Sequence, residues 1–325
     1  MSDFILDAYE ITDQGSKLLD AAHIIEGLKN ETLAWVHLNA DKAGAHGWLE
    51  TELNFIDPLI ISALTADETR PRVSKMGDGI LLILRGMNFN AGQDDEDMVS
   101  VRLYADALRI ISLEKRPVRS LSELAQDLTL GLPPRNTGQF VADLVQRMTK
   151  KADQAVAAID DKMDETEKLM IESTDGSNDA IRRDLSDIRM KAIKIRRHLA
   201  PQREALFELK SINVDWLSES DRRAVHEGYN RTMRAVEELD AIRERSQIIK
   251  DEITSRMSET LNKNTYILSL IAAIFLPLGF LTGLFGINIG GLPGIENGKA
   301  FLIFCLSMII LVICQIITFR KLKWF

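Results

Sequence analysis

The sequence predicts an α+β domain followed by long helices and then by two helices that cross a membrane. Strand-like and helical segments alternate over residues 1–134, and apolar residues then recur at helical spacing through residues 135–263. Two long runs without charged side chains lie in residues 264–325. The chain of 325 residues is 46% hydrophobic and 27% charged, which is an ordinary soluble composition on average. The contrast between a charged body and uncharged runs appears only when the sequence is followed along its length.

The first 134 residues are predicted to form the α+β domain. Strand-like segments lie at residues 34–40, 79–89, 98–105 and 107–114, and helical segments at residues 54–67 and 120–131. The acidic insert DDED, residues 94–97, falls between two of these strands. Such a run can collect cations, but at a hairpin tip it is usually only solvated.

Residues 135–263 are predicted to be a helical hairpin followed by a stalk helix. Apolar residues keep helical spacing from Val141 to Met163 and again, after the turn STDGSND, from Ile181 to Leu199. A third helix begins near Ser220 and meets no proline or glycine between Tyr229 and the first uncharged run. At ~1.5 Å per residue it forms a rod of roughly 90 Å, which can carry a twist or tilt and so suggests gating from the cytoplasm.

Two membrane spans are predicted at residues 266–285 and 300–319, joined by an outer loop at 286–299. A helix of about 20 apolar residues covers the roughly 30 Å hydrocarbon layer of a bilayer. The alternative is a pair of buried core helices, but those are usually shorter and keep a polar face. The N-terminus has neither a basic start nor an apolar run, so no signal peptide is expected and the polar body should stay in the cytoplasm.

Positive charges predict the orientation of the spans. Arg256 and Lys263 precede the first span, whereas the outer loop has only Lys299, offset by Glu296. The second span is followed at once by three more cations, Arg320, Lys321 and Lys323. Both termini are therefore expected on the cytoplasmic side.

One stripe of the first span has the composition of a pore lining. Two spans per chain cannot enclose a hydrated path, so conduction requires an oligomer. Small and polar residues with one bulky apolar residue recur at steps of three and four: Asn262, Thr265, Ser269, Ala272, Leu276, Gly279 and Gly283. Pro277 removes the helical donor to the Ala273 carbonyl and favours a bend. The alternative is a small-residue packing face, which is common in membranes.

The layout of the whole chain resembles the CorA family of divalent-cation transporters, and the last 65 residues or so contain the specific features. The carrying features are IFLPLGFLTGLFGIN at residues 274–288, a short loop, a second span and a basic end in Lys-Trp-Phe. Where the family has Tyr-Gly-Met-Asn or a relative, this chain has Phe285, Gly286, Ile287 and Asn288. That change, with GGLPG directly after it, is similar to the bacterial zinc-transporter (ZntB-like) branch. The resemblance implies a homopentameric funnel with an α/β/α cytoplasmic domain.

The resemblance also implies roles for single residues. The selectivity filter falls on Gly286, Ile287 and Asn288, with Asn288 as the outer ring. Pore-lining positions fall on Asn262, Thr265, Leu268, Leu276 and Gly279. The two leucines are the expected apolar constrictions, and Gly279 departs from the threonine common in magnesium channels. Glu296 is expected to attract cations in the outer loop, and the basic collar falls on Arg320, Lys321 and Lys323.

The expected cargo is a divalent cation that keeps much of its water shell. Five amide side chains offer carbonyl oxygens without the deep well of a carboxylate ring. Zinc prefers nitrogen and sulfur ligands, which the stripe lacks, so zinc selectivity is implied by the resemblance alone. The histidines show no ligand spacing and are interpreted as surface or core residues: His23, His37, His46, His198 and His226.

The zinc branch also implies proton-coupled uptake. Neither span contains an ionisable side chain that could relay a proton, so any such group is expected in the funnel or the outer loop. The expected partners are further copies of the chain, membrane lipid, divalent cations and protons, with no nucleic acid and no cofactor.

Three alternatives remain open on the sequence. One is a magnesium, cobalt or nickel channel of the same family. The second is a membrane-anchored scaffold without transport activity. The third is a tethered enzyme, for which the sequence offers no phosphate loop, nucleophile elbow or clustered metal site; no enzymatic activity is expected.

Overall fold

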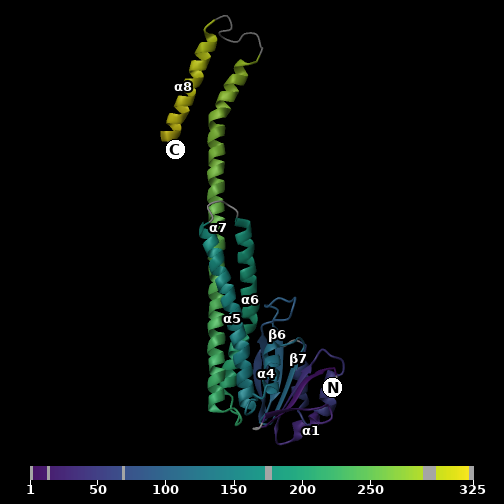
Figure 1. The fold of residues 1–325 in the computed structure, drawn as a ribbon. Coiled ribbons are helices and arrows are strands. Elements are labelled where there is room, and N and C mark those ends of the chain that lie inside the picture. The colour runs from purple at the N-terminus through teal and green to yellow at the C-terminus, as the bar shows by residue number, and fades with distance from the viewer. Residues whose placement is uncertain (1–2, 13–14, 68–69, 173–177, 288–297, 322–325) are drawn as a thin grey trace. The chain divides into compact units, whose positions relative to one another are not determined.

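The computed structural model describes residues 3–12, 15–67, 70–172, 178–287 and 298–321. The chain divides into two compact units, residues 1–250 and 251–325, and each is described by itself. Figure 1 follows the helices and strands along the chain.

The first unit contains a mixed β-sheet. Its strands are β1 (Ile5–Thr12), β2 (Gly15–Leu18), β3 (Leu33–Asn39), β4 (Arg72–Met76), β5 (Gly79–Gly86), β6 (Val99–Ala105) and β7 (Arg109–Glu114). Their order across the sheet is β2-β1-β3-β7-β6-β5-β4. β3 and β7 pair in parallel, with Val36 opposite Ile111, and the other neighbours are antiparallel. The central strands are buried on both faces, as expected of a sheet inside a layered fold.

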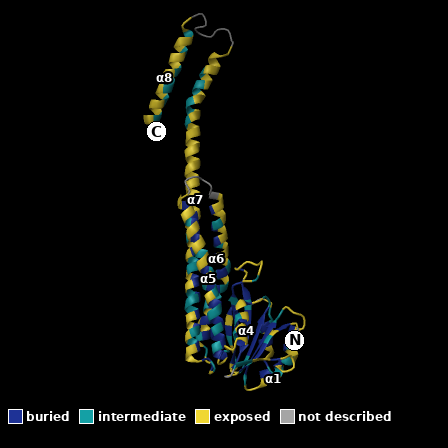
Figure 2. Ribbon diagram, viewed as in Figure 1, coloured by how far each residue is buried: buried dark blue, intermediate teal, exposed yellow. Residues whose placement is uncertain are grey.

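Helices cover both faces of the sheet, which confirms the predicted α/β/α arrangement. One face packs on α1 (Ile24–Lys29), α2 (Ala45–Glu52) and α3 (Pro58–Thr65), through core residues such as Leu28, Leu49 and Leu64. The other packs on α4 (Arg119–Thr129) and on the start of α5 (Thr137–Glu172), where Phe140 lies against Trp35 with ring centroids 5.0 Å apart. Figure 2 shows the buried sheet between these layers.

Long helices follow the sheet domain. α5 pairs with α6 (Asn178–Ser211) where a hairpin was predicted, and α7 (Glu219–Phe285) begins one residue before the expected start. The expected apolar stripe of α6 is buried at each position: Ile181, Leu185, Ile188, Ala192, Ile195 and Leu199. α5 and α7 approach closely at Gly228, where an added Cβ would lie 2.5 Å from Val145 Cγ1. A glycine is therefore needed at that crossing.

α7 runs without interruption into the first apolar span. The stripe on α7 is buried at Val225, Val236, Ile249 and Ile253, and burial stops after Ile253. α8 (Ala300–Lys321) is the second span. Among the described residues, these two helices are long and apolar enough to cross a membrane, and none of either apolar window is buried (Figure 2). A soluble core helix of this length would bury its apolar face, so the exposure favours membrane spans.

Candidate functional site

The predicted pore stripe lies on the face of α7 that α8 does not cover. Side chains of α7 that lose exposure in the second unit share one side of the helix: Leu270, Ala273, Ile274, Pro277, Leu278 and Leu281. Every member of the predicted stripe, counted from here on with the pore-lining position Leu268 that the resemblance adds, is exposed: Asn262, Thr265, Leu268, Ser269, Ala272, Leu276, Gly279 and Gly283. At roughly 100° per residue, the two sets lie on nearly opposite sides of α7. α8 thus leaves the stripe free to line a path or to meet another copy.

Two leucines of the stripe are the most prominent apolar groups on it. Leu268 is 67% exposed and Leu276 is 76% exposed. Leu276 borders an open apolar groove on α7, which is also lined by Ala272, Phe275, Pro277, Gly279 and Phe280. No atom of the described residues lies within 4 Å of a Cβ built at Gly279 or Gly283, so the described part of the chain leaves space beside both glycines.

The face toward α8 contains a polar contact that the sequence did not predict. Pro277 has no N–H, so the Ala273 carbonyl loses its helical donor. Gln315 Nε2 of α8 donates to that carbonyl at 3.3 Å. Gln315 Oε1 is buried and has no hydrogen-bond partner among the described residues. The sequence did contain a signal for this contact, because Gln315 is the only amide side chain in the second span. An amide side chain in lipid is unfavourable unless it forms a hydrogen bond.

α7 ends at Phe285, directly before the predicted filter. The Gly286 N–H donates to the carbonyls of Thr282 and Gly283, at 2.9 and 3.2 Å. The Phe285 ring packs on Phe304 of α8, with centroids 5.2 Å apart. Ile287 is 45% exposed. Two other predicted site residues, Asn288 and Glu296, lie outside the described residues.

The predicted basic collar lies at the end of α8. Arg320 and Lys321 form its last turn and are exposed, and Lys323 lies outside the described residues. Cations at a helix C-terminus also complement the helix dipole.

The acidic insert serves a structural purpose at one of its residues. Glu96 is only 7% exposed and lies 3.7 Å from both Lys191 and Lys194 of α6. The Asp97 carbonyl accepts a hydrogen bond from Arg116. The lysine contacts attach the β5–β6 connection to the hairpin, and the Arg116 contact attaches it to the β7–α4 connection.

The histidines are spread through the fold and serve local structure. His37 is buried on β3, where Nδ1 lies 2.9 Å from Ser112 Oγ and Nε2 lies 3.4 Å from Glu114. Although this set includes Ser, His and Glu, Ser112 is fully buried and cannot meet a substrate. His198 on α6 has its pKa lowered to about 4, first by burial and then by the positive charges of Arg85 and Arg197. Within the described ranges, no three His, Cys, Asp or Glu side chains are grouped to hold a metal ion.

One arginine of the stalk part of α7 contacts several carboxylates of the hairpin. Arg245 reaches three carboxylates of α5, with nitrogen–oxygen distances of 3.0 Å to Asp160, 2.5 Å to Asp164 and 2.6 Å to Glu167. Hydrogen bonds to Asp164 and Glu167 raise the pKa of Arg245 further above its ordinary value. The arginine fork suits several carboxylates at once.

Comparison with known proteins shows the family to which the chain is similar. The model of the family described as "CorA-like Mg2+ transporter protein" matches residues 30–321. The chain is 34% identical to the "Divalent cation transporter CmaX" of Pseudomonas aeruginosa, over 93% of this chain and 90% of that protein. It is 32% identical to the "Zinc transport protein ZntB" of Yersinia enterocolitica, over 90% of this chain and 88% of that one.

A solved structure agrees over nearly the whole length. The structure of full-length CmaX superposes with a TM-score of 0.86 at 32% identity, covering 99% of this chain and 98% of that chain. The sheet domain, the long helices and the two apolar spans are thus a shared architecture. The chain belongs to the CorA-like family of divalent-cation transporters.

Proposed function

We propose that this chain is one subunit of a homopentameric pore in the bacterial inner membrane, through which zinc is taken up. The observation that carries the proposal is the uncovered stripe of α7. Its small and polar side chains and its two leucines face away from α8 and stay exposed in the single chain. A ring of such stripes closes a path whose backbone groups are all bonded within helices.

The zinc assignment rests on relatives. Proteins named for zinc transport are 32–34% identical to this chain over most of its length. CmaX, at similar identity, is named only as a divalent-cation transporter. The stripe has no nitrogen or sulfur ligand of the kind that zinc prefers, so the ion passes with most of its water shell and Asn288 reads that shell.

The proposal includes coupling of zinc uptake to protons. Neither span has an Asp, Glu, His, Lys or Arg between residues 266–285 or 300–319. Proton-handling groups of this chain therefore lie outside the spans, in the funnel or in the outer loop, and both termini are on the cytoplasmic side.

Flux into liposomes tests the proposal. Purified protein should admit zinc to dye-loaded vesicles, and a pH gradient of fixed size should change the initial rate. Competition by magnesium, cobalt, nickel and cadmium ranks the transported ions. A stronger flux of magnesium than of zinc would favour the alternative of a magnesium channel.

Native mass measurement in mild detergent tests assembly separately. A pentamer is expected, and a monodisperse dimer would rule out the proposed pore. A folded pentamer that passes no divalent cation would favour a scaffold.

A further inference from the structure

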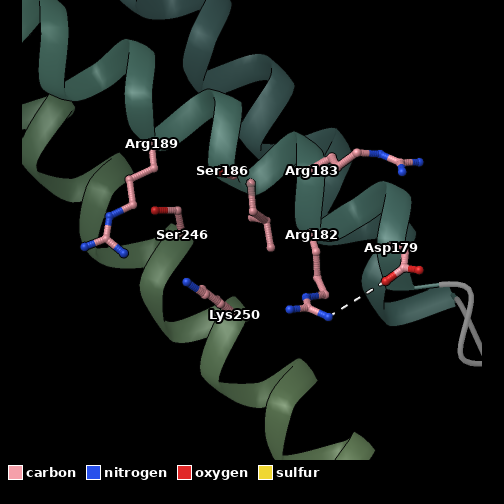
Figure 3. A pocket seen from close by; sticks show the side chains of 8 residues that line it. Asp179, Arg182, Arg183, Ser186, Arg189, Ser246 and Lys250 are labelled. Atoms are coloured by element: carbon pink, nitrogen blue, oxygen red, sulfur yellow. Dashed lines mark ion pairs between the residues drawn. The ribbon is translucent and has the colours of Figure 1, made fainter.

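We propose that a basic pocket between α6 and α7 binds a phosphate group. The pocket lies in the first unit, encloses about 420 Å³, and is lined by Asp179, Arg182, Arg183, Leu185, Ser186, Arg189, Ser246 and Lys250. Figure 3 shows these side chains on the two helices. None of the pocket's lining residues is a predicted pore-lining residue.

Charge is the first reason for an anionic ligand. Among the described residues, the lining has four cationic side chains and one carboxylate, Asp179, which lies 3.8 Å from Arg182. Like charges that share a pocket repel one another. A bound anion relieves this repulsion.

Geometry makes the pocket suitable for an anion with several oxygens. Arg182 and Arg189 are seven residues apart on α6, so they lie on the same face about two turns apart. Leu185 between them is buried and closes the inner side. Lys250 comes from α7, and Figure 3 shows it between Arg182 and Arg189, whereas the Arg183 guanidinium points away from it. A ligand that meets all three cations must bridge two helices.

Hydrogen bonding further limits the ligand to an acceptor. Arg189 Nη1 already donates to Gln247 Oε1 of α7, which holds its guanidinium at the helix crossing. The Ser246 hydroxyl donates to the Arg243 carbonyl at 2.8 Å, so donors to a ligand come from Ser186 and the cationic side chains. Guanidinium forks bind phosphate through paired N–H groups. A phosphate has enough oxygens to reach donors on both helices, whereas a carboxylate has two.

The phosphate can come from a free polyphosphate or from the headgroup of an anionic phospholipid. Pyrophosphate is the probe for the first source, titrated calorimetrically into full-length, delipidated protein in neutral detergent. Saturable binding with one site per chain is expected. Arg189→Gln and Arg182→Gln should each weaken it about tenfold or more, because each removes a charged hydrogen-bonding group.

Matched variants separate the pocket from general charge. Arg197→Gln removes an equal charge from an exposed position of the same helix and should change the dissociation constant by less than about twofold. Arg189→Lys keeps the positive charge but lacks the paired N–H donors of the guanidinium, so it should cause an intermediate loss of pyrophosphate affinity. This variant replaces Arg189→Gln as the test if Arg189→Gln does not fold.

Nanodiscs distinguish the two sources. If phosphatidylglycerol discs suppress pyrophosphate binding that phosphatidylcholine discs allow, and native mass spectrometry shows less phosphatidylglycerol on Arg189→Gln, the headgroup is the ligand. If both discs allow equal binding, a free phosphate is the ligand. The proposal is overturned if pyrophosphate and phosphatidylglycerol both bind wild type and Arg189→Gln alike, or if neither binds up to about 1 mM.

Discussion

Gln315 Nε2 of α8 bonds to the Ala273 carbonyl, the acceptor that Pro277 deprives of its helical donor. The proline and the glutamine are therefore complementary parts of one contact between the two spans. Proline in a membrane helix is tolerated where a neighbour satisfies the freed carbonyl. Here a side chain of the same subunit does so.

Replacement of the glutamine should weaken the pair of spans. Gln315→Leu leaves the Ala273 carbonyl without this donor and should cost about 0.6 kcal/mol, the average measured for hydrogen bonds between membrane helices, and at most about 1.7 kcal/mol. The thermal unfolding midpoint of the detergent-solubilised protein measures the effect. Thr318→Val is the matched control, because the Thr318 hydroxyl bonds within α8 to the Cys314 carbonyl.

A double-mutant cycle decides whether the proline is the cause. Pro277→Ala restores the backbone N–H, so the cost of Gln315→Leu should largely disappear in that background. An unchanged cost would show that Gln315 acts through some other contact.

Sequence patterns predicted the elements that depend on local spacing. The strands at residues 79–86, 99–105 and 109–114 and the hairpin of α5 and α6 were evident because apolar positions repeat at periods of two and of three to four. β1 was missed because its identity depends on pairing: Ile5 lies opposite Leu38 and Ala8 opposite Val36, in a register fixed by the sheet. β4 and the short helices α1 and α2 are too short to show a period.

For the candidate sites too, only features within one segment could be predicted from the sequence. The stripe from Asn262 to Gly283 follows from spacing on one helix, but which face meets α8 does not. The Gln315–Ala273 contact depends on the axial register of two helices, and the phosphate pocket depends on which side of α6 meets α7. Spacing within one segment cannot determine either relation.

The arginine of the stalk should matter for the hairpin more than for flux. Arg245→Gln leaves Asp160, Asp164 and Glu167 facing one another and should destabilise the first unit by about 1–2 kcal/mol. Hydrogen exchange should accelerate around residues 160–167 of α5. Arg234→Gln is the control, since Arg234 pairs only with Glu227 of its own helix at 3.7 Å among the described contacts. Equal exchange in both variants would contradict the prediction.

His198 should make stability fall in weak acid. Its pKa is about 4 in the folded protein against an ordinary value of 6.5, because burial and then Arg85 and Arg197 disfavour the charged form. The unfolded chain thus binds more protons between these values, and stability contributed by the neutral imidazole is lost as pH falls from about 6.5 to 4. His198→Gln should flatten this dependence of the thermal midpoint. A pH dependence in His198→Gln as steep as that of wild type would contradict the prediction.

Leu276 should form the apolar constriction of the assembled pore. Leu276→Ser adds a hydroxyl to each subunit at the ring, which favours wetting and should raise zinc leak severalfold while it loosens discrimination among divalent cations. Leu276→Met keeps the apolar volume and is the control. Wild-type flux in Leu276→Ser, with the pentamer intact, would place the constriction elsewhere, with Leu268 the next candidate.

Asn288 should be the first side chain that reads the water shell of an entering ion. Helix α7 ends at Phe285, three residues before Asn288 in the sequence. Asn288→Ala removes five amide oxygens from the assembled ring and should reduce zinc uptake to near background, with expression and pentamer formation unchanged. Asn288→Asp supplies the matched contrast: it keeps the oxygens but adds charge, so ions should bind more tightly and leave more slowly.

Glu296 should act on the same path from a distance. Glu296→Gln removes the negative charge of the outer loop and should weaken uptake mainly near 0.01 M salt, where the Debye length is about 30 Å, and little near 0.15 M, where it is about 8 Å. Because the side chain enriches cations rather than selecting among them, the order of preference among metals should stay the same. A loss of uptake in Glu296→Gln that is equal at both salt concentrations would indicate direct contact between Glu296 and the ion instead of long-range attraction. Near-normal zinc uptake by Asn288→Ala would refute the assignment of Asn288 to the selectivity filter.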